Sequence, residues 1–317
     1  MTPHAAVANP EAIDPLGPID DGRYSDDMVT VSAGDAMQPR EGLPVTHTKH
    51  FDVWTDDGLF LCHRLTDDQI DDSLTTLLEN ELFGPGRVVG GQVFERLFTG
   101  IVRTSRPEAI DAWSLFYRNS RKRLAPVIAS GPPTGEGLDS LEEFGAIYAR
   151  ADEYVPVTGT VLEVGSCFGF LALHLARLPG RYVTASDISA GSMGLLDAVG
   201  RHLHVPIRTM VCDAARIPRP DRSESTVVLS HLLEHLDPAH GLRALDEAMR
   251  VARSRVIVAV PYEDVANTAF GHVRTIDRSD LEAWGRRATG WDWIVEDHHG
   301  GWLILDRSSL DRSSLDC

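Results

Sequence analysis

Cysteine and long apolar runs are both scarce in this sequence. Only four of the 317 residues are cysteine, at positions 62, 167, 212 and 317, and none of them forms a C-x-x-C pair. Scattered cysteines argue against a disulfide framework and are typical of a reducing compartment. No apolar run approaches the roughly 20 residues of a membrane helix, and the first residues, MTPHAAVANPEAIDPLGP, do not resemble a signal peptide. We therefore expect a soluble, cytoplasmic protein.

Basic charge is also in short supply. The sequence has 47 acidic and 30 basic residues, for a formal net charge of −17. Nucleic-acid-binding proteins usually present a basic face, so the composition argues against a nucleic-acid partner. Hydrophobic residues make up 43% of the chain, which is enough for a packed core. The length allows one large domain, or one domain with a smaller partner.

The first part of the chain predicts a small module. Residues 1–42 are rich in Pro, Gly and Asp, and we expect them to form a disordered tail. Residues 43–135 predict an α+β accessory module that covers the substrate. It begins with two strands around a turn at Asp57-Gly58 and continues with helical patterns over 67–83, 91–103 and 107–128. ASGPPTGEG (129–137) is typical of a linker.

Residues 136–306 have a different pattern, in which short Val-, Ile- and Leu-rich strands alternate with helices. Such strands indicate a parallel sheet that is covered on both faces. The expected strands are 159–166, 181–187, 207–213, 225–231 and 255–261, and WDWIVEDHHGGWLILD (291–306) predicts a final hairpin with an antiparallel strand. The fold class is therefore α/β, with a doubly wound, mostly parallel, Rossmann-like sheet of seven strands. The repetitive tail, 307–317, is expected to be disordered.

Glycines and acids follow the first three of these strands. LEVGSCFGF places Glu163, Gly165 and Gly169 at the carboxyl edge of the sheet, where ligands bind in such folds. The stretch is neither a G-x-G-x-x-G motif nor a phosphate-binding P-loop. Asp187 and Asp213 end the next two strands, where carboxylates can accept from ribose hydroxyls and an adenine amino group. Each Asp alone is as readily a helix N-cap, but the series favours a ligand with adenine and ribose and no phosphate.

Over residues 138–306 the motifs VLEVGSCFG, SD, CDAARIP, STVVLSHLLEHLDP and RVIVAVP resemble class I S-adenosylmethionine-dependent methyltransferases. This resemblance implies an enzyme that uses S-adenosylmethionine, with Gly165 and its neighbours at the methionine part, Asp187 at the ribose and Asp213 at the adenine. Cys167 replaces the usual central glycine, which leaves the contact of the loop with the methionine part open. The implied cofactor-binding residues are Glu163, Gly165, Ser166, Cys167, Gly169, Asp187, Ile188, Asp213, Ala214 and Ser230.

The stretch LSHLLEHLDP (229–238) contains H-x-x-E-H, which is also a zinc-peptidase signature. Its place inside a methyltransferase-like sheet argues against a protease. We expect His231, Glu234 and His235 to begin the helix after the fourth strand and to share one of its faces.

Three interpretations of this stretch stay open. The residues shape the helix start, or His231 or His235 is a catalytic general base, or His231, Glu234, His235 and His272 bind a divalent metal ion. The metal interpretation follows a resemblance to the E-x-x-E-H motif of small-RNA 2′-O-methyltransferases and of some quinone-pathway O-methyltransferases, in which His231 would replace the first glutamate. Such an ion lowers the pKa of an acceptor hydroxyl.

The acceptor depends on the covering segments. Trp113, Phe116 and Tyr117 are lid or core aromatics, and the cluster Arg118, Arg121, Lys122 and Arg123 is a solvated face or a contact for an acidic substrate. FYRNSRKRL, VPYEDVANTAFGHVRTID and DHHGGWLILDR resemble the methyltransferases associated with mycofactocin biosynthesis, which O-methylate a glucose of an oligosaccharide. This resemblance implies a role in cofactor biosynthesis and a glycosylated small-molecule acceptor. The alternatives are another metabolite, such as a quinone or antibiotic precursor, or a non-catalytic binding protein. The oligomeric state stays open.

Overall fold

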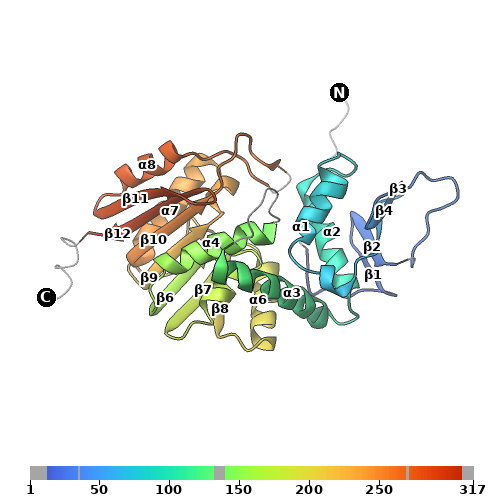
Figure 1. The fold of residues 1–317 in the computed structure, drawn as a ribbon, viewed down its shortest axis with the longest axis horizontal. Coiled ribbons are helices and arrows are strands. Elements are labelled where there is room, and N and C mark those ends of the chain that lie inside the picture. Colours follow the sequence, from blue (N-terminus) through green and yellow to red (C-terminus); the bar gives the residue numbers. More distant parts are fainter. Residues whose placement is uncertain (1–12, 35, 132–139, 269–270, 309–317) are drawn as a thin grey trace, which may run out of the picture.

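The computed structural model describes residues 13–34, 36–131, 140–268 and 271–308. These residues form a small sheet of five strands and a larger sheet of seven strands, with helices between and around them (Figure 1). Among the described helices, none has both the length and the apolar character that a membrane crossing requires.

The small sheet has the strand order β1-β2-β5-β4-β3. Its β4–β5 hairpin turns at Asp57-Gly58, as the sequence predicted. The strands are β1 (Arg23–Ser25), β2 (Val29–Ala33), β3 (Thr46–His47), β4 (Phe51–Thr55) and β5 (Leu59–His63).

The expectation of a disordered tail over 1–42 is wrong from residue 13 onward, because β1 and β2 lie within it. β2 pairs in parallel with β5, which lies about 30 positions later in the sequence, so the local pattern alone did not reveal the strand. Val31 of β2 is fully buried and packs against Gly100. A Cβ atom added to Gly100 would lie only 2.6 Å from Cγ2 of Val31. Residues 1–12 lie outside the described part of the chain.

Helices follow the small sheet and lead to the large one. The expected linker over 129–137 is helical at its start, since α3 extends through Ser130, and residues 132–137 lie outside the described residues. The elements are η1 (Asp67–Gln69), α1 (Leu74–Leu78), the π-helical turn η2 (Glu79–Phe83), α2 (Gly91–Thr104), α3 (Ala109–Ser130) and α4 (Ser140–Tyr154).

The large sheet confirms the predicted fold class. Its order is β11-β12-β10-β9-β6-β7-β8, and all neighbours are parallel except β12, which runs antiparallel to both β10 and β11. The strands are β6 (Gly159–Val164), β7 (Arg181–Asp187), β8 (Ile207–Val211), β9 (Glu224–Ser230), β10 (Ala252–Val260), β11 (Trp291–Asp297) and β12 (Gly301–Arg307). The helices are α5 (Phe170–Leu175), α6 (Ala190–His202), η3 (Leu233–His235), α7 (Pro238–Val251) and α8 (Arg278–Arg287).

Neighbouring residues on the central strands enter different hydrophobic cores. Val161 and Val228 belong to a core with α4, α5 and α6, whereas Leu162 and Val227 belong to a core with α7 and α8. Successive side chains of a strand point to opposite faces, so an apolar strand of this kind must be covered on both sides. This packing is the physical basis of the doubly wound arrangement.

The first of these cores continues into the N-terminal module, and α3 bridges the two parts (Figure 1). Trp113, Phe116 and Tyr117 of α3 are all fully buried, so they are core residues and the lid interpretation is wrong. The ring of Phe168, which lies in the loop after β6, is 5.8 Å from Trp113 and 5.4 Å from Phe116. The apparent boundary near residue 135 therefore does not divide the core.

The end of the chain is ordered slightly further than expected. Arg307 belongs to β12 and lies over the ring of Trp291, with 4.3 Å between its guanidinium carbon and the ring centre. The expectation of disorder is therefore wrong for residues 307 and 308. Residues 309–317, with most of the repeat and Cys317, lie outside the described residues.

Candidate active site

The loop after β6 is a tight turn at the carboxyl edge of the large sheet. Gly165, Cys167 and Gly169 all have positive φ, at 76°, 48° and 70°. The backbone N–H groups of Gly165 and Ser166 donate to the carbonyl of Ser186, at 2.8 and 2.9 Å, which ties the loop to the end of β7. A Cβ on Gly169 would lie 2.4 Å from Cδ2 of Leu196, so glycine lets the start of α5 approach α6 closely.

Asp187 is oriented by this loop and does not cap a helix. Its Oδ2 accepts from the backbone N–H of Cys167 at 3.0 Å and its Oδ1 accepts from that of Ser189 at 2.9 Å. Ser189 is the N-cap of α6, so the capping alternative for Asp187 is wrong. The carboxylate is half-buried at the end of β7, and Ile188 beside it is 72% exposed. A carboxylate held in place by two backbone N–H groups, next to the exposed apolar side chain of Ile188, is suited to bind a nucleoside.

Asp213 makes polar contacts within the chain that the sequence did not indicate. Its Oδ1 accepts from the backbone N–H of Ala215 at 2.9 Å and lies 2.6 Å from Nε2 of His240 in α7. The bond from Ala215, followed by the bond from His240, lowers the pKa of the carboxyl. Sequence reasoning missed His240, which lies two residues beyond the motif STVVLSHLLEHLDP and outside it.

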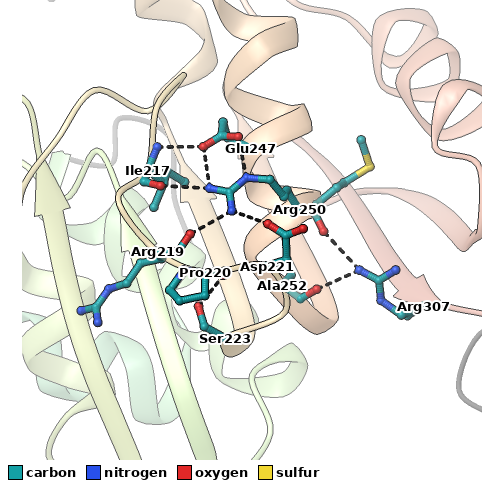
Figure 2. A network of polar contacts seen from close by, with 10 residues as sticks. Ile217, Arg219, Pro220, Asp221, Ser223, Glu247, Arg250, Ala252 and Arg307 are labelled. Atoms are coloured by element: carbon teal, nitrogen blue, oxygen red, sulfur yellow. Dashed lines mark hydrogen bonds and ion pairs between the residues drawn. The ribbon is translucent and has the colours of Figure 1, made fainter. Parts of the chain in front are cut away.

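The segment between Asp213 and β9 is held to α7 by a network around Arg250 (Figure 2). The guanidinium donates to the carbonyls of Ile217 and Arg219, at 2.9 and 2.8 Å. It also pairs with the carboxylates of Glu247 and Asp221, each at 2.7 Å. Two carbonyls and two carboxylates on one guanidinium use its fixed fork of donors, so Arg250 fixes the course of the segment that follows Asp213.

Glu163 is the most deeply buried acid of the loop region. It is 4% exposed, and burial raises the pKa of its carboxyl to about 8. Its Oε2 has no hydrogen-bond partner among the described residues. Ala214 and Ser230, the other predicted cofactor residues, are half-buried at the ends of β8 and β9.

The stretch after β9 is not the α-helix that the sequence predicted. His231 has a φ of +51°, Leu233–His235 is a 3-10 turn, and α7 begins only at Pro238. The helix starts there because the Asp237 side chain accepts from the N–H groups of Ala239 and His240, and because proline suits a first helical position. His231, Glu234 and His235 therefore do not share a helical face.

The structure nevertheless gathers three of the four metal-ligand candidates. Side-chain ligand atoms of Glu234, His235 and His272 lie within 4.8 Å of one another, and this is the one such group in the described part of the chain. Glu234 is 1% exposed, burial raises its pKa to about 8, and neither carboxylate oxygen has a hydrogen-bond partner among the described residues. His231 lies outside the group, with its Nδ1 3.6 Å from Oε1 of Glu234.

The two histidines of this group are oriented by residues that the sequence reading did not single out. Nδ1 of His272 lies 2.8 Å from Oε2 of Glu263, and Nδ1 of His235 lies 3.3 Å from the carbonyl of Gly271. A carboxylate or carbonyl on one ring nitrogen fixes the histidine ring for coordination or proton transfer by the other.

The remaining covering residues come from α3 and α4. The ring of Phe144 packs edge-on against His231 at 5.3 Å. In the basic cluster, Arg118 and Lys122 are exposed and Arg123 pairs with Asp71 at 3.1 Å, which agrees with a solvated face.

Residues 161–255 match the family described as "Methyltransferase domain". The chain contains a methyltransferase domain. The matched segment begins in β6 and extends into β10, so it includes the glycine loop, Asp187, Asp213 and the H-x-x-E-H stretch. Together with the seven-stranded sheet, the match supports methyltransferase activity, and the chain is an enzyme. No protein of curated function matches the sequence.

Parts of several solved methyltransferases are similar to part of this chain at low sequence identity. A SAM-dependent methyltransferase from Aquifex aeolicus is 16% identical, with a TM-score of 0.42 over 50% of this chain and 87% of that one. A SAM-dependent methyltransferase from Methanosarcina mazei is 15% identical, with a TM-score of 0.42 over 50% and 96%. Magnesium protoporphyrin IX methyltransferase from Synechocystis PCC 6803, solved with bound SAH, is 16% identical, with a TM-score of 0.43 over 59% and 94%.

Proposed function

We propose that this methyltransferase transfers a methyl group from S-adenosylmethionine to a hydroxyl of a glycosylated small molecule. The observation that carries the proposal is the contact between the glycine loop and the stretch after β9. A Cβ on Gly165 would lie 2.7 Å from Cδ1 of Leu232, which stands between His231 and Glu234. A cofactor on the loop would therefore present its methyl group to the Glu234–His235–His272 group, and methyl transfer depends above all on such alignment.

The cofactor roles follow from the strand ends. The loop from Gly165 to Gly169 lies at the carboxyl edge of the sheet and would hold the methionine part. The anchored carboxylate of Asp187 would accept from the ribose hydroxyls, with Ile188 beside the adenine ring. Asp213 is bound to His240 through Oδ1, so it would accept from the adenine amino group through Oδ2.

The acceptor hydroxyl has to lose a proton as the new bond forms. His235 is the proposed general base, because its side chain is exposed and its Nδ1 is engaged by Gly271, which directs Nε2 to the proton. His231 is mostly buried, burial lowers its pKa to about 4, and it would act as a neutral neighbour of the acceptor.

The same residues fit a divalent metal ion. Both buried carboxylate oxygens of Glu234 lack a hydrogen-bond partner within the described part of the chain. Both histidines are oriented from the far side of the ring, as metal-binding histidines are. A divalent ion bound by Glu234, His235 and His272 would act as a Lewis acid that lowers the pKa of the acceptor hydroxyl. Glycans offer adjacent hydroxyls, which suits such a site, and a neutral acceptor agrees with the acidic surface.

Chelation tests the metal. We expect an excess of chelator to abolish turnover and an added divalent ion to restore it, with thermal unfolding as the control for structural damage. Full turnover in chelator would leave His235 as a base that acts without metal.

The acceptor is tested by incubating the enzyme and S-adenosylmethionine with a cell extract. We expect the mass of one methylene group to be gained by a glycan. A gain on an unglycosylated metabolite would instead support the alternative of a quinone or antibiotic precursor. Absence of any heat on titration with millimolar S-adenosylmethionine would indicate a non-catalytic binding protein.

A further inference from the structure

The glycine loop is bordered by carboxylates from both parts of the chain. Glu163 and Asp187 belong to the large sheet, whereas Asp72 belongs to the N-terminal module, between η1 and α1. Asp72 is 9% exposed, which is unusual for an acid on a connecting segment. No cofactor motif of the sequence includes it.

Helix α3 holds Asp72 and the loop on one of its faces. The backbone N–H of Asp72 donates to Oγ of Ser120 at 3.0 Å, and the hydroxyl of Tyr117 donates to the carbonyl of Phe168 in the loop at 2.7 Å. Tyr117 and Ser120 are three positions apart on the helix and therefore neighbours on its surface. The short span between them fixes Asp72 relative to the turn that begins at Gly165.

The charge of Asp72 reaches the loop region. Burial first, and then the charges of Asp72 and Glu163, raise the pKa of the buried Tyr148 in α4. Burial first, and then the charges of Asp187 and Asp72, also raise the pKa of the Cys167 thiol, which belongs to the glycine loop, so the charge of Asp72 acts on the loop itself.

Glu163 independently points to a ligand. Its side chain is buried and its Oε2 lacks a hydrogen-bond partner among the described residues, which is costly without a partner from outside the chain. A cation that enters the loop region would meet the charge of Asp72 in a poorly solvated setting, where charges interact strongly.

We propose that Asp72 makes the cofactor pocket selective for the positively charged methyl donor over its neutral product. The inference depends on the proposed use of S-adenosylmethionine. In the reaction the C–S bond breaks, the electron pair stays on sulfur, and the methyl group bonds to the acceptor oxygen, which gives up its proton. Sulfur thereby changes from a sulfonium cation to a neutral thioether. The attraction to Asp72 is present before transfer and absent after it, which favours release of S-adenosylhomocysteine.

The test compares the binding of donor and product by calorimetry. In Asp72→Asn we expect the Kd for S-adenosylmethionine to rise about tenfold, which corresponds to about 1.4 kcal/mol, and the Kd for S-adenosylhomocysteine to stay within about twofold. Asp68→Asn is the matched control, because it removes the same charge from an exposed position of the same segment. It should leave both constants unchanged. Asp72→Glu keeps the charge and should keep the preference.

If Asp72→Asn raised the Kd for both ligands equally, Asp72 would be a structural residue and the proposal would be overturned. An unchanged Kd for both ligands would overturn it as well. Should that variant fail to fold, Ser120→Ala releases the backbone of Asp72 and should lower the same preference. An unchanged preference there would count against the proposal. If the wild-type protein bound neither ligand, the proposed function itself would be refuted. That result is distinct from the outcomes for the Asp72 and Ser120 variants.

Discussion

At the scale of single residues, the glycine loop after β6 depends on backbone conformations that few amino acids tolerate. Gly169 combines a φ of +70° with a Cβ position 2.4 Å from a buried leucine side chain. Gly194 in α6 has neither constraint, since nothing lies within 4 Å of its Cβ position. The two glycines therefore form a natural pair for comparison.

We expect Gly169→Ala to lower the free energy of unfolding by about 2 kcal/mol, from backbone strain and overpacking together. Gly194→Ala should instead raise it by about 0.5–1 kcal/mol, because alanine is the better helix former. Urea denaturation of both variants measures this. Equal unfolding free energies would show that the contact with Leu196 is not a real constraint.

Glu163 also predicts a pH dependence. Burial raises its pKa from 4.5 to about 8, so the folded protein holds this proton more tightly than the unfolded chain. The resulting stability is fully present below about pH 4.5 and is lost as the pH rises through about 8.

We expect the cofactor-free protein to become less stable between about pH 5 and pH 8, and Glu163→Gln to reduce this slope. Glu234, whose pKa is also raised to about 8, should supply the remainder. Urea denaturation at several pH values provides the measurement. A slope unchanged by the substitution would mean that Glu163 is already ionised in the fold.

At the scale of elements, the contacts of α7 decide where the segment after Asp213 runs. The Arg250 fork reaches two carbonyls and two carboxylates at once (Figure 2), whereas the nearby Arg253 reaches two carbonyls only at 3.3 and 3.4 Å. We expect Arg250→Lys to cost about 1–3 kcal/mol, because lysine cannot replace the planar fork. Arg253→Lys should cost less than about 0.5 kcal/mol. Thermal and urea unfolding of the pair give the comparison, and similar losses would contradict the role of the network.

At the scale of the whole molecule, one hydrophobic core includes both the small sheet and the face of the large sheet that carries α4, α5 and α6. Parts that share a core unfold together. We expect far-ultraviolet circular dichroism and tryptophan fluorescence to report one coincident transition, and S-adenosylmethionine to shift that transition as a whole. Two separate transitions, of which the cofactor moves only one, would show that the N-terminal module folds independently.

The sequence by itself determined the elements of the large domain and the order of its strand ends. Apolar strands, glycine turns and acids such as Gly165 and Asp187 are visible because backbone preference and strand burial leave a pattern within a few neighbouring residues. The family match to residues 161–255 agrees with that pattern.

Only the tertiary structure decided which residues lie together at the candidate site. β2 is a strand because β5 pairs with it, and His272 is oriented by Glu263. Helix α3 bonds both to the backbone of Asp72 and to the loop at Phe168. His231 lies outside the ligand group, and the helix that the sequence places at this histidine starts only at Pro238. Contacts of this kind join residues that are distant along the chain, and they depend on how whole faces pack, which no local pattern records.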